Sequence, residues 1–361
     1  MPESEAISEA PPSRTPMRRL IIPLATIAAS VAFALLVSEL ILLLLDVNPE
    51  YQYGDWRLEL DRRVLYRIKP GSGPEINRLG FRDVEFPREK GGRTRVLFLG
   101  DSFTMGHNVA PEQSLPKALE RQLGAGYEVF NLGIYGYGPD QALTRLVDEG
   151  FDLSPDAVLL GVFAANDFGD LYKNQLYQTN AAGSISFNAD NPVARELPYS
   201  RTAMLARKAL TREHYLEATR ELALWRLLLG DTYELLGEPD EPRTAAVIRL
   251  MEGVLVGFQR ETQGRGIPFG VVIIPSYENT RDVSWFRDRG VPLAVRFRNE
   301  SAVEAICRRR GLPFLSLVGP FLRERDRPIY DSGDHHFSVE GNEFAASLVA
   351  PFFLKEVVGR E

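Results

Sequence analysis

Short runs of large apolar residues alternate with amphipathic stretches over most of the chain after residue 93. The first run, Val96 to Leu99, holds four such residues in succession and lies between Arg95 and Gly100. A run of this kind predicts a strand buried on both faces, as in a parallel sheet covered by helices. Similar runs predict further strands at 127–132, 156–163, 269–275 and 313–317.

Stretches with helical spacing of apolar residues separate these runs, at 114–123, 247–261, 294–309 and 338–357 and in a helix that begins near Pro139. Pro139 fits the first position of its helix, and Ser338 fits the N-cap of the last one. Alternating strands and helices predict an α/β fold with a parallel sheet and right-handed crossovers.

The alternation stops between about 170 and 242, where we expect an insertion into this fold. Its first part is polar, and residues 203–236 have a helical pattern. The apolar stripe of that pattern consists of Leu222, Trp225, Leu228 and Leu229. A stripe with helical spacing is typical of a packed core, so Trp225 receives no binding role.

The N-terminal part has a different pattern. A polar stretch that we expect to be disordered begins a tail at 1–19, and an apolar run then extends from Leu20 to Leu45. That run is long enough to cross a bilayer. Because Arg14, Arg18 and Arg19 precede it, we expect a cytoplasmic N-terminus and an extracytoplasmic domain after the span.

A cleaved signal peptide is the alternative for this run, with Ala32-Phe33-Ala34 as the cleavage motif. The run continues past that motif into its most apolar part, which favours an uncleaved transmembrane anchor at 20–45. Residues 46–92 are then a charged, turn-rich linker or collar, in which Phe81 and Phe86 can dock on the domain at 93–361.

Charge and cysteine content exclude some classes of function. The formal net charge is −7 and no basic stripe stands out, which argues against a nucleic-acid partner. The single cysteine, Cys307, excludes an internal disulfide and a cysteine-rich metal site.

Polar residues and glycines follow several predicted strands at the same edge of the sheet. Ser102 follows the first strand, Gly133 and Gly136 the second, and Asn166 the third, while Asp334 and His336 precede the last helix. Acyl transfer needs such groups: a serine, a base to deprotonate it, a carboxylate to orient the base, and donors for the oxyanion.

Plainer interpretations exist for each of these residues. The glycines fit turns, and Asp101 and Asn166 fit helix caps. The sequence Asp334-His335-His336 resembles the metal ligands of DHH phosphoesterases, but that chemistry needs more strand-end aspartates than Asp101 and Asp167. His107 and His214 have no other candidate catalytic or metal-binding residues near them in sequence and are interpreted as surface residues.

Four blocks together resemble those of the SGNH/GDSL hydrolase superfamily. They are Gly100-Asp101-Ser102-Phe103, Asn131-Leu132-Gly133-Ile134-Tyr135-Gly136, Ala164-Ala165-Asn166-Asp167 and Asp334-His335-His336-Phe337-Ser338. The resemblance extends from about residue 93 to the end of the chain. It implies a flavodoxin-like α/β/α sandwich and hydrolysis or transfer of acyl groups through a serine ester, without a cofactor or a metal.

The resemblance also implies roles for individual residues. Ser102 is the nucleophile, His336 the base, and Ser102, Gly136 and Asn166 supply the oxyanion donors. The chain has Asp-x-His where the family more often has Asp-x-x-His. Asp334 is therefore the expected orienting carboxylate, and Asp331 is kept as an alternative.

An outward-facing, membrane-anchored domain of this type resembles envelope enzymes that act on O-acetyl groups. The expected function is ester hydrolysis on envelope glycans or related acylated molecules. The alternatives are an O-acyltransferase to polysaccharide or peptidoglycan, a lipid esterase, and a catalytically silent glycan-binding protein.

Overall fold

The computed structural model describes residues 15–45, 50–53, 56–180, 183–196, 202 and 235–359. The chain divides into two units, one made of residues 1–49 and 198–215 and the other of 50–197 and 216–361. The second unit contains every residue of the expected acyl-transfer site.

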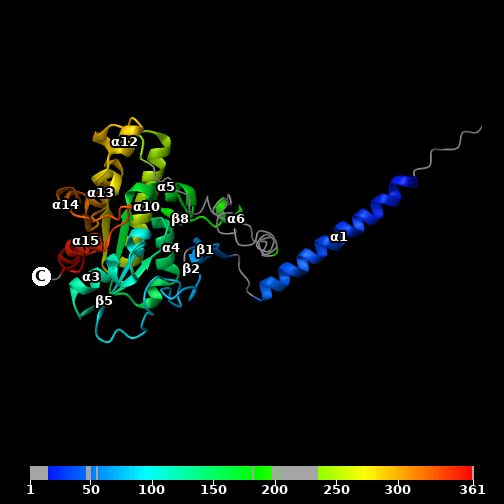
Figure 1. Cartoon of the computed structure of the whole chain (residues 1–361), viewed down its shortest axis with the longest axis horizontal. Helices are drawn as coiled ribbons and strands as arrows, with labels where there is room; N and C mark the ends of the chain where they lie inside the picture. The colour runs from blue at the N-terminus through cyan, green and yellow to red at the C-terminus, as the bar shows by residue number, and fades with distance from the viewer. Residues whose placement is uncertain are drawn as a thin grey trace, which may run out of the picture. The chain divides into compact units, whose positions relative to one another are not determined.

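A parallel sheet of five strands forms the centre of the second unit (Figure 1). The strands are β4 (Thr94–Gly100), β5 (Tyr127–Gly133), β6 (Ala157–Phe163), β9 (Phe269–Ile274) and β10 (Phe314–Ser316). Their order is β10-β9-β6-β4-β5, the flavodoxin-like order in which the second strand lies on one side of the first and the third on the other. The predicted fold class is confirmed, and the sheet reverses its order beside β4.

Helices cover both faces of this sheet (Figure 1). One face carries α3 (Leu115–Leu123) and α15 (Val339–Phe352), which share an apolar core with Val96, Phe98 and other strand residues. On the other side α4 (Pro139–Asp148), α5 (Ala164–Asn174), α10 (Pro242–Gln263) and α13 (Arg298–Arg310) pack on one another and on the sheet. All four apolar residues from Val96 to Leu99 are fully buried, as the sequence predicted.

Two helix starts also agree with the sequence. Pro139 is at the start of α4, and Ser338 caps α15 by accepting a hydrogen bond from the N–H of Gly341 at 3.0 Å. The shorter elements of the second unit are α2 (Ser102–Met105), η1 (Pro111–Gln113), η2 (Gly150–Leu153), β7 (Tyr177–Thr179), β8 (Ile185–Phe187), α6 (Pro192–Glu196), α11 (Tyr277–Thr280), α12 (Ser284–Asp288), η4 (Leu293–Val295), α14 (Val318–Arg323) and η5 (Phe353–Val357).

Residues 56–92, called the collar below, pack on the sheet domain. They begin with strands β2 (Trp56–Asp61) and β3 (Leu65–Ile68), which form an antiparallel sheet with β1 (Glu50–Tyr53). The expected aromatic docking is confirmed, because Phe86 stacks on Phe130 at 4.1 Å between ring centroids and Phe81 is fully buried beside it.

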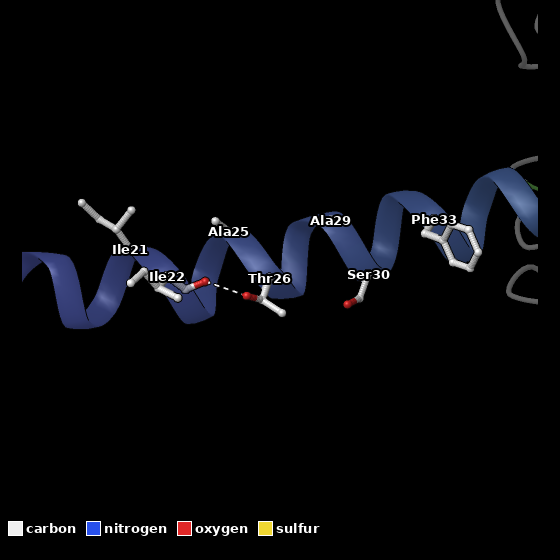
Figure 2. A pocket seen from close by; sticks show the side chains of 7 residues that line it. All are labelled: Ile21, Ile22, Ala25, Thr26, Ala29, Ser30 and Phe33. Carbon is white, nitrogen blue, oxygen red and sulfur yellow. Dashed lines mark hydrogen bonds between the residues drawn. The ribbon is translucent and has the colours of Figure 1, made fainter.

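The first unit contains α1 (Thr15–Leu44), and its segment 21–44 is long and apolar enough to cross a membrane. The residues that line a pocket on this helix are drawn in Figure 2: Ile21, Ile22, Ala25, Thr26, Ala29, Ser30 and Phe33. Glu39, the acidic residue of the run, accepts a hydrogen bond from the N–H of Thr202 at 3.0 Å.

The helical stretch expected at 203–236, with Leu222, Trp225, Leu228 and Leu229, lies almost wholly outside the described residues, as do His214 and residues 1–14. The described part of the insertion contains the β7–β8 hairpin and α6. The sheet domain resumes at Pro242, five residues before the predicted start of that helix.

Candidate active site

Ser102 is placed by a tight turn between β4 and α2. Asp101 is the N-cap of α2, and its carboxylate accepts a hydrogen bond from the N–H of Phe103 at 3.0 Å. Gly100 is required here because a Cβ atom at this position would lie 2.2 Å from the hydroxyl oxygen of Thr104. Ser102 is the first residue of α2 and is 6% exposed, so its hydroxyl is held at the carboxyl edge of the sheet.

A second backbone contact fixes α2 in place. A Cβ atom on Gly133, at the end of β5, would lie 2.3 Å from the backbone nitrogen of Met105. Gly133 therefore allows α2 to lie directly on β5. The N–H of Gly133 donates to the side-chain oxygen of Asn131 at 3.0 Å, a contact within the end of β5.

The loop 331–336 is closed by its own backbone and tied to β9. The N–H of Asp331 donates to the carbonyl of His336 at 2.7 Å, and His335 has a φ of 66°. The hydroxyl of Tyr330 donates to the carbonyl of Pro275 at 2.9 Å. These contacts hold the segment before α15 beside the carboxyl end of the sheet.

Ser102, His336 and Asp334 lie in one chain of hydrogen bonds. His336 Nε2 is 2.8 Å from Ser102 Oγ, and its Nδ1 is 2.9 Å from Asp334 Oδ2. Asp334 Oδ1 accepts the backbone N–H of His336 at 3.1 Å. Because the ionised carboxylate can only accept, Nδ1 carries the proton in this arrangement and Nε2 accepts from the serine hydroxyl.

The charge of Asp334 is stabilised by these partners. Partial burial alone would raise the pKa of Asp334, but the hydrogen bond and the charge of His336 outweigh it, and the Asn108 side chain adds a further hydrogen bond. The pKa of Asp334 is therefore held well below its usual range. The carboxylate stays ionised wherever His336 can act as a base.

The alternative residues in this loop have other partners. Asp331 Oδ1 accepts the backbone N–H groups of Gly333 at 2.7 Å and Asp334 at 3.3 Å, so this carboxylate shapes the turn. His335 stacks on Tyr277 with 3.9 Å between ring centroids and places Nδ1 3.0 Å from Glu278. The two adjacent imidazoles therefore face different groups.

The expected oxyanion donors come from the neighbouring strands. Gly136 lies in the loop after β5 with a φ of 73°, which favours glycine. Asn166 lies in the first turn of α5, directly after β6. Both β5 and β6 pair with β4, so the two residues follow strands on either side of the one that carries Ser102.

The sequence analysis missed the position of His107. Its ring lies 5.1 Å from the ring of His336 and 4.8 Å from that of Tyr135, and its Nε2 is 3.8 Å from Asp334 Oδ2. Burial and the neighbouring His336 lower the pKa of His107 to about 4, so it is neutral near pH 7. The only sequence signal was its position five residues after Ser102.

Two buried carboxyl groups lie behind the serine. Burial raises the pKa of Asp101 to about 7 against the opposing effect of His336, and burial together with Asp101 raises that of Asp167 well above its usual value. For both carboxyl groups, burial favours the neutral form over the charged one.

Several solved structures resemble this chain. A lipase/acylhydrolase from Enterococcus faecalis is 13% identical, with 74% of this chain and 99% of that chain covered and a TM-score of 0.41. An acetyl xylan esterase is 14% identical, with coverages of 71% and 97% and a TM-score of 0.39. A two-domain esterase active on acetylated mannans is 15% identical, with coverages of 73% and 50% and a TM-score of 0.37.

No protein-family model and no curated protein matches the chain. The low identities and TM-scores of the solved structures transfer no activity to it. The function is therefore argued from the residues of the chain itself.

Proposed function

We propose that this protein is a serine esterase of the SGNH/GDSL hydrolase type. The observation that carries the proposal is the chain of hydrogen bonds from Ser102 Oγ through His336 to Asp334, at 2.8 and 2.9 Å. The four sequence blocks that resemble the superfamily meet at one edge of a flavodoxin-like sheet, which supports the same proposal.

In the first half of the reaction, Ser102 Oγ attacks the ester carbonyl carbon while His336 Nε2 takes its proton. The tetrahedral intermediate collapses when His336 returns this proton to the leaving alkoxide, which departs as an alcohol and leaves Ser102 acylated. In the second half, His336 deprotonates a water that attacks the acyl carbon, and the acid leaves as Ser102 regains its proton.

We assign the developing oxyanion to the N–H groups of Ser102 and Gly136 and the side-chain amide of Asn166. Such donors stabilise the transition state more than the ester itself, because the negative charge is concentrated on that oxygen only during reaction. Asp334 keeps His336 in the tautomer that accepts from Ser102 and stabilises the imidazolium that forms.

The proposed substrates are acyl esters on envelope glycans or related molecules outside the cytoplasmic membrane. The apolar segment 21–44, preceded by arginines, supports this location. Water is proposed as the acyl acceptor.

The direct test is labelling with a fluorophosphonate, in which Ser102 Oγ displaces fluoride from phosphorus. The full-length chain should be labelled and should hydrolyse a p-nitrophenyl acetate or an acetylated oligosaccharide. Ser102→Ala should lose both properties while keeping its thermal unfolding temperature. Equal labelling and turnover in Ser102→Ala would place the reaction elsewhere.

A further inference from the structure

Arg82, in the collar, is a buried arginine that the reaction described above does not use. Its residue is 8% exposed, and its guanidinium donates to the carbonyl oxygens of Gly106 at 2.6 Å and Val109 at 2.7 Å. Its Nε donates to Glu75 at 2.8 Å. A buried guanidinium needs all of these acceptors, and the planar group reaches both carbonyls at once.

The two carbonyls are the ends of the loop 106–109, which follows the helix that carries Ser102. Gly106 ends α2, and the N–H groups of Gly106 and His107 both donate to the carbonyl of Ser102 at 3.1 Å. The guanidinium of Arg82 thus closes this loop from outside, four residues after the nucleophile.

The middle of the loop 106–109 contacts the carboxylate of the hydrogen-bonded triad. The Asn108 side chain hydrogen-bonds to Asp334, and His107 Nε2 lies 3.8 Å from Asp334 Oδ2. The Asp334 side chain is 35% exposed, so burial alone does not fix its rotamer. A carboxylate this exposed needs neighbouring groups to keep it on Nδ1 of His336.

We propose that Arg82 is a positioning residue for the triad. It holds the loop 106–109 so that Asn108 and His107 keep the Asp334 carboxylate against His336. This inference rests on the proposed esterase function and adds a residue of the collar to its machinery.

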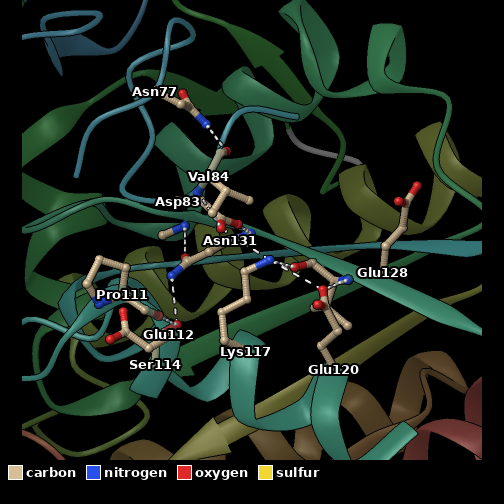
Figure 3. A network of polar contacts seen from close by, with 12 residues as sticks. Asn77, Asp83, Val84, Pro111, Glu112, Ser114, Lys117, Glu120, Glu128 and Asn131 are labelled. Carbon is tan, nitrogen blue, oxygen red and sulfur yellow. Dashed lines mark hydrogen bonds and ion pairs between the residues drawn. The ribbon is translucent and has the colours of Figure 1, made fainter. Parts of the chain in front are cut away.

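The neighbouring residue holds the collar in the place this role requires. Asp83 accepts the backbone N–H of Asn131 at 2.9 Å and lies 3.1 Å from the ammonium group of Lys117, which also donates to the carbonyl of Val129 at 2.8 Å (Figure 3). Asp83 therefore holds the backbone next to Arg82 against β5. With its own backbone fixed in this way, Arg82 can hold the loop 106–109 in one position.

The test compares Arg82→Gln and Arg82→Lys in the full-length chain, each with and without Asp334→Asn. We expect Arg82→Gln to lower kcat on an acetyl ester by about tenfold or more with KM nearly unchanged, since small misplacements of a catalytic group have effects of that order. Arg82→Lys keeps the charge but loses the planar fork, so it should restore part of the loss. In the Asp334→Asn background, Arg82→Gln should cost less than about twofold, because residues that act through one another are not additive.

Arg78→Gln is the matched control, since Arg78 lies in the same collar with an 85% exposed side chain paired with Glu85 at 3.2 Å. It should leave kcat and KM at the values of the unmodified chain. An equal loss from Arg82→Gln with and without Asp334→Asn would show a general structural role and overturn the proposal.

Hydrogen–deuterium exchange gives a readout that does not depend on activity. Amides of 102–110 and 331–338 should exchange faster in Arg82→Gln and Arg82→Lys than in the unmodified chain, and unchanged exchange in both segments would also overturn the proposal. A failure of the esterase function itself shows differently, as equal turnover by the unmodified chain and Ser102→Ala.

Discussion

The adjacent residues His335 and His336 contact different groups. The sequence alone could not tell which of the two lies next to Ser102. His336 Nε2 lies 2.8 Å from Ser102 Oγ, whereas His335 faces Glu278. The left-handed backbone at His335 turns successive side chains apart. The choice between the histidines therefore follows from one backbone conformation.

We predict that His336→Ala lowers kcat on an acetyl ester as much as Ser102→Ala, because members of a triad act as a unit. His335→Ala should lower kcat by less than about tenfold, since its imidazole faces Tyr277 and Glu278 and not Ser102. Steady-state kinetics on the five single variants, including Asp334→Asn and Asp331→Asn, measure this directly.

The carboxylates should divide in the same way. Asp334→Asn should fall between the two histidine variants, and Asp331→Asn should retain most of the activity because Asp331 Oδ1 accepts backbone N–H groups. Loss of activity in Asp331→Asn with full activity in Asp334→Asn would assign the orienting role to Asp331. An active His336→Ala together with an inactive His335→Ala would make His335 the base.

The predictability of single residues depended on what surrounds them in sequence. Ser102 and His336 each lie in a short sequence motif that is typical of acyl-transfer sites, so the sequence alone pointed to them. His107 has no such neighbours, and its contact with the triad arises because α2 ends at Gly106 and the chain then turns back towards Asp334. Arg82 was equally hidden, since a partner 24 residues away gives no periodic signal.

At the scale of elements, burial on both faces made the central strands predictable. A strand such as Val96–Leu99 must be apolar at every position, and few other structures require that pattern. Strands β2 and β3 were missed because they are short and contain charged residues such as Glu59 and Arg67, which pair across the hairpin at 2.7 Å. Tertiary pairing determines these strands, and a local pattern does not report it.

A buried carboxyl group joins two helices and makes the stability of the fold dependent on pH. Glu300 of α13 is 1% exposed and accepts a hydrogen bond from the Asn279 side chain of α11 at 2.5 Å. Burial raises the pKa of Glu300 to about 7. Between its ordinary pKa and about 7, the folded state holds a proton that the unfolded state has lost, so stability falls as pH rises through that window.

We predict that Glu300→Gln removes this contribution. Relative to the unmodified chain, the variant should gain stability by up to about 1.4 kcal/mol for each pH unit between about 4.5 and 7, with no further change above that range. Urea unfolding of both proteins across this range measures the difference. Ser301→Ala, on the same helix and without a titratable group, is the control whose curve should run parallel to that of the unmodified chain. A parallel curve for Glu300→Gln would contradict the assigned pKa.

At the scale of the whole molecule, the candidate site is assembled from segments far apart in the chain. Ser102 and His336 are separated by 234 positions, yet their side chains share a hydrogen bond. The sequence predicted this meeting because the strands of a parallel sheet run in one direction, so that all their carboxyl ends lie at one edge. It did not predict that the collar at 56–92 supports the same edge, because that contact depends on tertiary hydrogen bonds from Arg82 and Asp83.

The location of that site relative to a membrane depends on α1. Its apolar segment 21–44 spans about 36 Å as a helix, which exceeds the roughly 30 Å of a bilayer core. Arg14, Arg18 and Arg19 precede the segment, so we predict that the N-terminus stays in the cytoplasm and the unit that carries Ser102 lies outside. In a bacterial host, alkaline phosphatase fused after Glu361 should be active and green fluorescent protein at the same position dark.

The protein should stay with the membrane pellet after a carbonate wash, whereas cleavage after Ala34 would release a soluble form that begins at Leu35. Replacing the three arginines with glutamine should reduce the phosphatase signal, since these charges set the orientation. Fluorescence of the fusion after Glu361 would show the opposite orientation, with Ser102 in the cytoplasm. Envelope esters would then be out of reach of Ser102.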